Sequence, residues 1–91
     1  MTIKYSNHFL RKLEELLGET TYILRYEKGN FKSGWCILND HKVIVVNKYY
    51  AVDGKINCLL DILKTVDVDT DQLSPKNKKL YYELAQTELE L

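Results

Sequence analysis

The sequence predicts one α+β domain spanning residues 1–91, in the order helix, three-stranded antiparallel meander, helix, helix, with the helices mainly on one face of the sheet. Apolar residues at helical spacing occupy both ends of the chain, and β-branched and aromatic residues fill the middle. Short connections favour pairing of successive strands. Hydrophobic residues make up 45% of the chain and charged residues 29%, which is typical of a folded domain rather than a disordered one.

The first predicted helix covers residues 6–17. Ser6 or Asn7 can cap its first turn, and Gly18 is placed to end it in a left-handed turn. Charged residues occupy one side of this helix. Its apolar side chains share the other side, which we expect to face the core: Phe9, Leu10, Leu13, Leu16 and Leu17.

Three strands are predicted in the middle of the chain: Thr21–Glu27, Phe31–Leu38 and Lys42–Asn47. Gly29-Asn30 indicates a tight hairpin turn between the first two strands, and Asn39–His41 a second turn. The third strand is apolar on both faces, so we expect it to be the most deeply buried and to be covered on each side.

Two further helices complete the predicted domain. Asp53 is expected to cap a helix from Gly54 to Thr65, whose apolar residues spread over much of its surface. Ser74 followed by Pro75 is a strong helix start, because serine caps the N-terminus and proline suits the first helical position. The last helix therefore runs from Pro75 to about Glu88.

No residue pattern in the sequence predicts a metal, cofactor or catalytic site. A structural zinc site needs about four ligands in close pairs, whereas the candidate ligands here are isolated: Cys36, Cys58, His8 and His41. The acidic segment Asp67–Asp71 begins like a calcium loop but lacks the glycine and the final glutamate that such a loop requires. The glycines are scattered and form no phosphate-binding loop. We therefore expect no cofactor and no enzymatic activity.

The sequence also predicts where the protein resides. Met1–Ser6 lack the apolar core of a secretory signal. Apolar runs such as Val43–Val46 are far shorter than the roughly 18 residues of a membrane helix. We expect a cytoplasmic protein with no membrane association, in which Cys36 and Cys58 are reduced and buried.

A cluster of basic and aromatic residues surrounds the predicted first hairpin and the end of the third strand. As a candidate interaction surface it comprises Arg25, Lys28, Phe31, Lys32, Trp35, Tyr49 and Tyr50. Aromatic residues and arginine anchor protein interfaces. Single-stranded nucleic acid needs the same residue types, for base stacking and for backbone charge. A third interpretation is that the aromatic residues form the core face of the sheet.

These observations favour a small non-catalytic interaction module. Its expected partner is another protein or a second copy of the chain, because a three-stranded sheet has two open edges. Binding of single-stranded nucleic acid is the alternative. It is less favoured because 13 basic and 13 acidic residues give a formal net charge of zero, which is not a strongly basic footprint.

The element order also suggests a family resemblance. Val43–Asn47 is a strand that ends in asparagine, and Lys55–Lys64 is the helix that follows it. This order resembles the minimal zincin-like metallopeptidases of the phage-repressor-cleaving type, whose corresponding helix carries His-Glu-x-x-His. In the best register Leu60 and Lys64 replace the two histidines, and Asp61 replaces the glutamate. The resemblance therefore implies a decayed hydrolase scaffold without zinc or peptidase activity.

A second resemblance covers the whole chain. The stretch Arg-Tyr-Glu-Lys-Gly-Asn-Phe-Lys-Ser-Gly at residues 25–34 is similar to that of small uncharacterised bacterial proteins. This likeness implies no particular activity.

Overall fold

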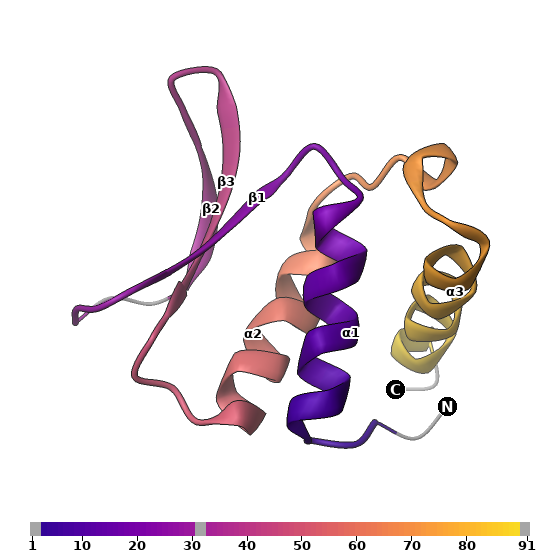
Figure 1. Ribbon diagram of the computed structural model, residues 1–91, viewed down its shortest axis with the longest axis horizontal. Coiled ribbons are helices and arrows are strands. Elements are labelled where there is room, and N and C mark those ends of the chain that lie inside the picture. Colours follow the sequence, from indigo (N-terminus) through magenta and orange to yellow (C-terminus); the bar gives the residue numbers. More distant parts are fainter. Residues whose placement is uncertain (1–2, 31–32, 90–91) are drawn as a thin grey trace.

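The structure is a computed structural model that describes residues 3–30 and 33–89. The predicted α+β class and the order of the elements are confirmed. Figure 1 shows the sheet on one side, α1 and α2 packed against it, and α3 on the far side of α1. The elements are α1 (Asn7–Gly18), β1 (Ile23–Glu27), β2 (Gly34–Leu38), β3 (His41–Asn47), α2 (Val52–Thr65), the short 3₁₀ helix η1 (Thr70–Gln72) and α3 (Pro75–Leu89).

The strand order differs from the predicted meander. The order is β1-β3-β2, with β1 parallel to β3 and β2 antiparallel to β3. Val43 in β3 therefore lies between Ile23 of β1 and Cys36 of β2. The predicted antiparallel meander is wrong, because the two strands that it paired first lie at opposite edges of the sheet.

The tight turn of the sheet lies at Asn39-Asp40, where one of the two turns was predicted. Both residues have positive φ angles, 51° and 65°. Such a pair forms the two-residue turn whose twist matches that of an antiparallel hairpin, and Asn and Asp tolerate this conformation best after glycine. The predicted hairpin at Gly29-Asn30 is wrong. That segment belongs to a loop that carries the chain from β1 across the end of β3 to β2, and Gly29 adopts a φ of 152° that other residues rarely reach.

This crossing loop is held by Asn47, the last residue of β3, which is only 6% exposed. Its backbone N–H donates to Ser33 Oγ at 3.0 Å, and its Nδ2 donates to the carbonyl oxygen of Gly29 at 2.8 Å. Its Oδ1 accepts a hydrogen bond from the backbone N–H of Tyr49 at 3.0 Å. One buried residue thus fixes both ends of the crossing and the first turn after β3.

The core lies between the sheet and the helices α1 and α2. The apolar stripe predicted for the first helix is confirmed, since all five of its residues are buried. Ser6 caps this helix as predicted, because its Oγ accepts from the N–H of Phe9. Gly18 does not end the helix in a left-handed turn. It is the last helical residue, its φ is not positive, and Glu19 is the C-cap. Tyr22, just before β1, also enters the core, and β3 and α2 contribute Ile44, Val46, Ile56, Leu59, Ile62 and Leu63.

The opposite face of the sheet carries no helix among the described residues (Figure 1). The expectation that β3 is covered on each side is therefore wrong, although β3 is the central strand. Val43, which points to that open face, is still only 4% exposed because neighbouring residues on both flanking strands stand beside it.

The starts of the last two helices differ in how well they follow the sequence signals. Ala51, not Asp53, is the N-cap of α2, and Asp53 lies in the first turn, where its Oδ1 accepts from the N–H of Gly54. The predicted start of α3 at Pro75 is confirmed. There Ser74 Oγ accepts a hydrogen bond from the N–H of Asn77 at 3.4 Å.

Glu19 connects the end of α1 to the start of α3. Its Oε1 accepts a hydrogen bond from the backbone N–H of Ser74 at 2.7 Å. This backbone hydrogen bond, with a smaller contribution from the side chain of Asn77, lowers the pKa of Glu19 below its ordinary value of 4.5. The ionised carboxylate also lies where the N-terminus of a helix favours negative charge.

Replacing Glu19 should therefore change how the stability depends on pH. Because the pKa is lower in the folded state, the ionised form stabilises the fold above the unfolded pKa, and this contribution disappears as the pH falls through the folded pKa. The difference in urea midpoint between wild type and Glu19→Gln should be largest near about pH 7 and shrink toward about pH 3. The exposed Glu15→Gln serves as the control. A difference for Glu19→Gln that stays constant with pH would contradict this account.

Replacing Asn47 should destabilise the crossing. Asn47→Leu introduces an apolar side chain of similar size and leaves the carbonyl of Gly29 and the N–H of Tyr49 without this partner, at a cost of about 2–4 kcal/mol in the free energy of unfolding. Urea titration followed by Trp35 fluorescence measures this. Asn57→Leu is the matched control, because Asn57 is exposed and its side chain accepts one surface hydrogen bond, from Tyr5. Equal small losses in the two variants would show that Asn47 does not hold the crossing.

Candidate interaction surface

Strand β2 forms one edge of the sheet and is exposed along most of its length. It pairs with β3 alone among the described strands. Its sequence, Gly-Trp-Cys-Ile-Leu, contains no charged residue and no proline, and every residue in it is half-buried or exposed. Cys36 is exposed and Cys58 is half-buried, so the expectation that both cysteines are buried is wrong. Edge strands of soluble proteins normally carry a lysine, a proline, a bulge or a covering element that prevents further pairing. None of these devices occurs within β2.

The backbone hydrogen bonds show which groups of β2 face outward. At the end of β3 the N–H of Asn47 donates toward the β2 side, and the N–H of Lys48 donates to β1. Because the direction alternates along a strand, the odd-numbered residues of β3 bond toward β2. Cys36, which pairs with one of them, therefore bonds toward β3. The N–H and C=O groups of Trp35 and Ile37 consequently point toward the open edge.

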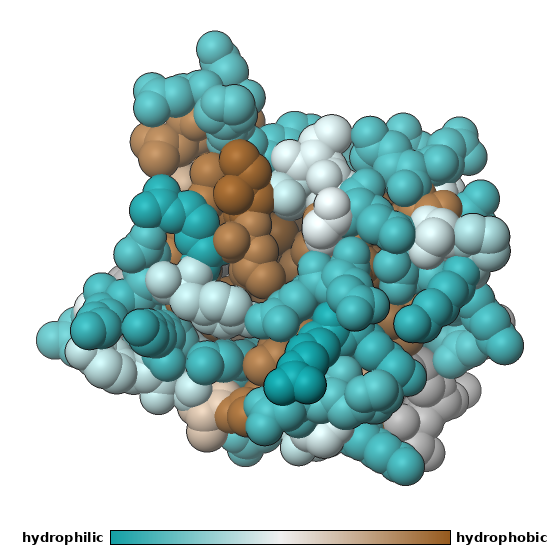
Figure 2. Space-filling model, in the orientation of Figure 1, coloured by the Kyte–Doolittle hydropathy of each residue, from teal (hydrophilic) through white to brown (hydrophobic). Residues whose placement is uncertain are grey.

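The side chains along this edge are large, apolar and exposed. Trp35 is 42% exposed, Ile37 64% and Leu38 50%. They remain exposed because the β2–β3 hairpin projects beyond the ends of α1 and α2 (Figure 1), so the helices cover little of it. Figure 2 shows hydrophobic residues gathered on this projecting hairpin and toward the helices. We call Trp35, Ile37 and Leu38, with the backbone edge between them, the β2 edge surface.

Trp35 has a defined environment on the helix-facing side of the sheet. Its ring meets the ring of buried Tyr22 edge-on, with centroids 6.2 Å apart and an interplanar angle of 87°. The Nζ of Lys42 lies 5.4 Å from the centroid of the same Tyr22 ring. Both contacts are of favourable types, an edge-to-face aromatic pair and a cation–π pair. The contact with Tyr22 holds one side of the Trp35 ring in place, while Trp35 as a whole remains 42% exposed.

The structure does not bring the predicted cluster together as one surface. Arg25 lies on β1, points to the open face of the sheet, and its Nη2 forms a salt bridge with Glu27 Oε1 at 2.5 Å. Trp35 lies at the other edge and points to the helix-facing side. Phe31 and Lys32 lie outside the described residues. The prediction assumed that β1 and β2 form one hairpin, and the order β1-β3-β2 separates them.

The remaining predicted residues occupy two loops. Lys28 is exposed in the crossing loop. Of the adjacent tyrosines after β3, one is exposed as expected: Tyr49 is 71% exposed. Tyr50 is half-buried and lies against α2, where a Cβ added to Gly54 would be only 3.3 Å from the Cβ of Tyr50.

Ile37 and Leu38 are the surface residues that the sequence reasoning missed. Their signal was present. An uncharged apolar run from Trp35 to Leu38 stops at the Asn39-Asp40 turn, and its side chains alternate without any polar residue on either face. Such a run fits a buried central strand equally well, and only the strand order shows that it forms an edge.

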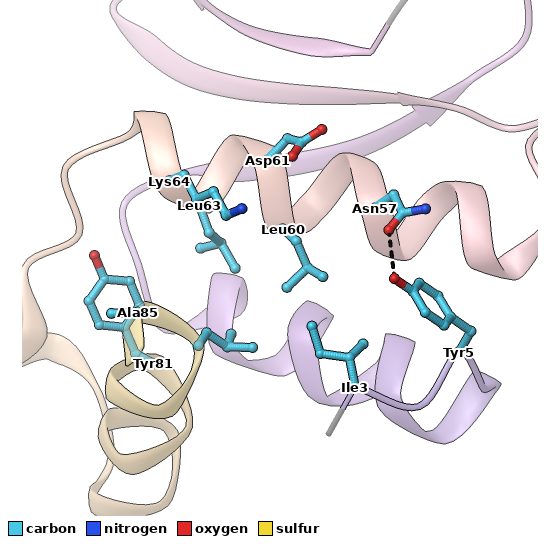
Figure 3. A pocket seen from close by; sticks show the side chains of 10 residues that line it. Ile3, Tyr5, Asn57, Leu60, Asp61, Leu63, Lys64, Tyr81 and Ala85 are labelled. Carbon is cyan, nitrogen blue, oxygen red and sulfur yellow. Dashed lines mark hydrogen bonds between the residues drawn. The ribbon is translucent and has the colours of Figure 1, made fainter. Parts of the chain in front are cut away.

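A concave feature, separate from the β2 edge surface, lies between α2, α3 and the segment before α1. It is a pocket of about 310 Å³ (Figure 3). The hydroxyl of Tyr5 donates to Asn57 Oδ1 at 3.0 Å across one side of it. The residues of the zincin-like register lie here too, with Leu60, Asp61 and Lys64 all lining the pocket. Among the described residues, no three His, Cys, Asp or Glu side chains lie close enough together to hold a metal ion.

Comparisons with known proteins add no family. No family model, curated protein or solved structure matches this chain. In the part of the chain that the structure describes, no helix has both the length and the apolar character needed to cross a membrane. The zincin-like resemblance remains a hypothesis.

Proposed function

We propose that the protein is a non-catalytic interaction module that binds its partner by adding a strand to the open edge of β2. The single observation that carries this proposal is the uncharged edge on which Trp35, Ile37 and Leu38 remain exposed. In strand addition the main-chain hydrogen bonds provide affinity, and alternate side chains provide specificity. The β2 edge surface offers both, through the outward backbone groups and the apolar side chains of Trp35 and Ile37.

The exposed apolar area is large enough to contribute to binding. Full burial of a large apolar side chain is worth about 1.5–3 kcal/mol, so covering the exposed parts of Trp35, Ile37 and Leu38 contributes about 2–4 kcal/mol. Tryptophan is also among the residue types that most often dominate binding energy. The contact of Trp35 with Tyr22 keeps its side chain ordered before binding, which lowers the entropy lost on association.

A photo-crosslinking experiment in the expressing cell tests this proposal. The residue p-benzoylphenylalanine replaces Ile37 in one protein and Tyr82, 52% exposed on α3, in the control. We expect a discrete adduct from position 37, either with another protein or with the same chain, and none from position 82. Adding Trp35→Ala should reduce the adduct by about tenfold, because it removes the largest anchor. Absence of any adduct at position 37, or adducts unaffected by Trp35→Ala, would contradict the proposal.

Binding of single-stranded nucleic acid is the second candidate, and one observation favours it. Lys42 lies over Tyr22, and Tyr22 supports the exposed ring of Trp35, so a cation and a stacking surface occur together. It ranks second because β2 itself carries no positive charge and Arg25, on the other edge strand, is paired with Glu27.

Trp35 provides the test of this candidate, because it is the sole tryptophan of the chain. If bases stack on it, an oligothymidine should quench its fluorescence at low salt, and affinity should fall steeply as salt increases. Lys42→Gln should weaken binding, with Lys76→Gln on α3 as the control. Unchanged fluorescence at low salt would exclude nucleic-acid binding through Trp35.

A further inference from the structure

We infer that the occupant of the β2 edge surface is a second copy of this chain, paired antiparallel about a two-fold axis beside Cys36. The inference rests on the proposed function and specifies its partner. The result is a continuous six-stranded sheet in which the two β2 strands are the central neighbours.

The backbone geometry selects this register. Within β2 the outward N–H and C=O groups belong to Trp35 and Ile37. A two-fold axis beside Cys36 places Trp35 opposite Ile37 of the second copy, and Ile37 opposite its Trp35. Each such pair exchanges both hydrogen bonds, as hydrogen-bonded pairs in antiparallel sheets do. Every outward N–H and C=O group of β2 then has a hydrogen-bond partner in the second copy. The pairing uses no residue of the Asn39-Asp40 turn or of the crossing loop.

The absence of charge makes self-pairing feasible. A two-fold axis brings each strand against an identical strand, so a charged residue near the axis would meet its own like charge, which destabilises cross-strand pairs. Strand β2 has no charged residue. The formal net charge of the whole chain is zero, so two copies have no net repulsion to overcome.

The side chains are complementary in the same register. On the helix-facing side, Trp35 and Ile37 of both copies form one apolar cluster that continues into the Tyr22 contact of each core. On the open face, Leu38 of one copy lies opposite Gly34 of the other. A Cβ at Gly34 would meet nothing within 4 Å, so there is free space at this position to receive the leucine.

The contact is small. A single pair of five-residue strands buries less than the roughly 1,200 Å² of stable interfaces, so we expect a dissociation constant on the order of 100 µM. Such a weak dimer forms at high local concentration and leaves the edge free at low concentration.

Disulfide trapping tests the register. The axis makes Cys36 and its copy a non-hydrogen-bonded pair, with Cα atoms about 4.5 Å apart, which is within the range that a disulfide bridges. In a Cys58→Ser protein, oxidised glutathione should convert two Cys36 thiols to one intermolecular disulfide, with release of two reduced glutathione molecules. The control carries Cys36→Ser, Cys58→Ser and Leu38→Cys. Its thiols would be about 13 Å apart along the strands and should not cross-link.

Sedimentation of the reduced protein tests the association itself. The average mass should rise between about 10 µM and about 1 mM. Ile37→Lys should abolish this rise, whereas Tyr82→Lys on α3 should leave it unchanged.

A monomer at every concentration, or equal cross-linking of Cys36 and Leu38→Cys, would overturn the inference. If the chain stays monomeric while position 37 still forms adducts with another protein in cells, the second copy is excluded and the proposed function stands. If position 37 forms no adduct either, both fail.

Discussion

The backbone of the chain must pass from β1 to β2 across the end of β3, and the buried amide of Asn47 holds it there. This side chain donates to the loop at Gly29 and accepts from Tyr49, while its backbone N–H donates to Ser33. Burial of an amide is tolerated only when its hydrogen bonds are satisfied. The crossing loop supplies partners for the buried Asn47, and Asn47 in turn holds the crossing loop against the end of β3. Because the crossing separates β1 from β2, β3 becomes the strand with which both others pair.

The exposed edge follows from this arrangement. The helices α1 and α2 pack over one face of the sheet, but the hairpin of β2 and β3 extends beyond them. On the inner strand of that hairpin, Ile44 and Val46 are fully buried. On the outer strand the same kinds of residue, Trp35 and Ile37, remain exposed and border unpaired backbone groups. The core residues of the hairpin are thus buried, whereas the outer edge of β2 keeps unpaired backbone groups. The proposed interaction would pair these groups with an added strand.

Local features of the fold could be predicted from the sequence, and non-local ones could not. The stripe from Phe9 to Leu17, the Ser6 cap and the start at Pro75 depend on residues within a few positions of one another, and all three are confirmed. The strand order depends on which distant strands meet. Gly29-Asn30 and Asn39-Asp40 are both good two-residue turn signals, and no local rule states that one of them is a crossing. The partners of Asn47 are non-local for the same reason. The candidate surface was therefore predicted in part: Trp35 belongs to the exposed edge, but Arg25 lies on the opposite one.

Residue-resolved amide hydrogen exchange, in solution too dilute for the proposed self-association, tests the strand order most directly. If β3 is central and β2 is an open edge, the amide of Cys36 should exchange at least about tenfold more slowly than those of Trp35 and Ile37. Amides of β3 should be protected at both odd and even positions, because they bond alternately to the two flanking strands. Strong protection of the Trp35 and Ile37 amides, with unprotected alternate amides in β3, would instead place β2 in the centre of the sheet. That result would contradict the strand order β1-β3-β2 and the open β2 edge.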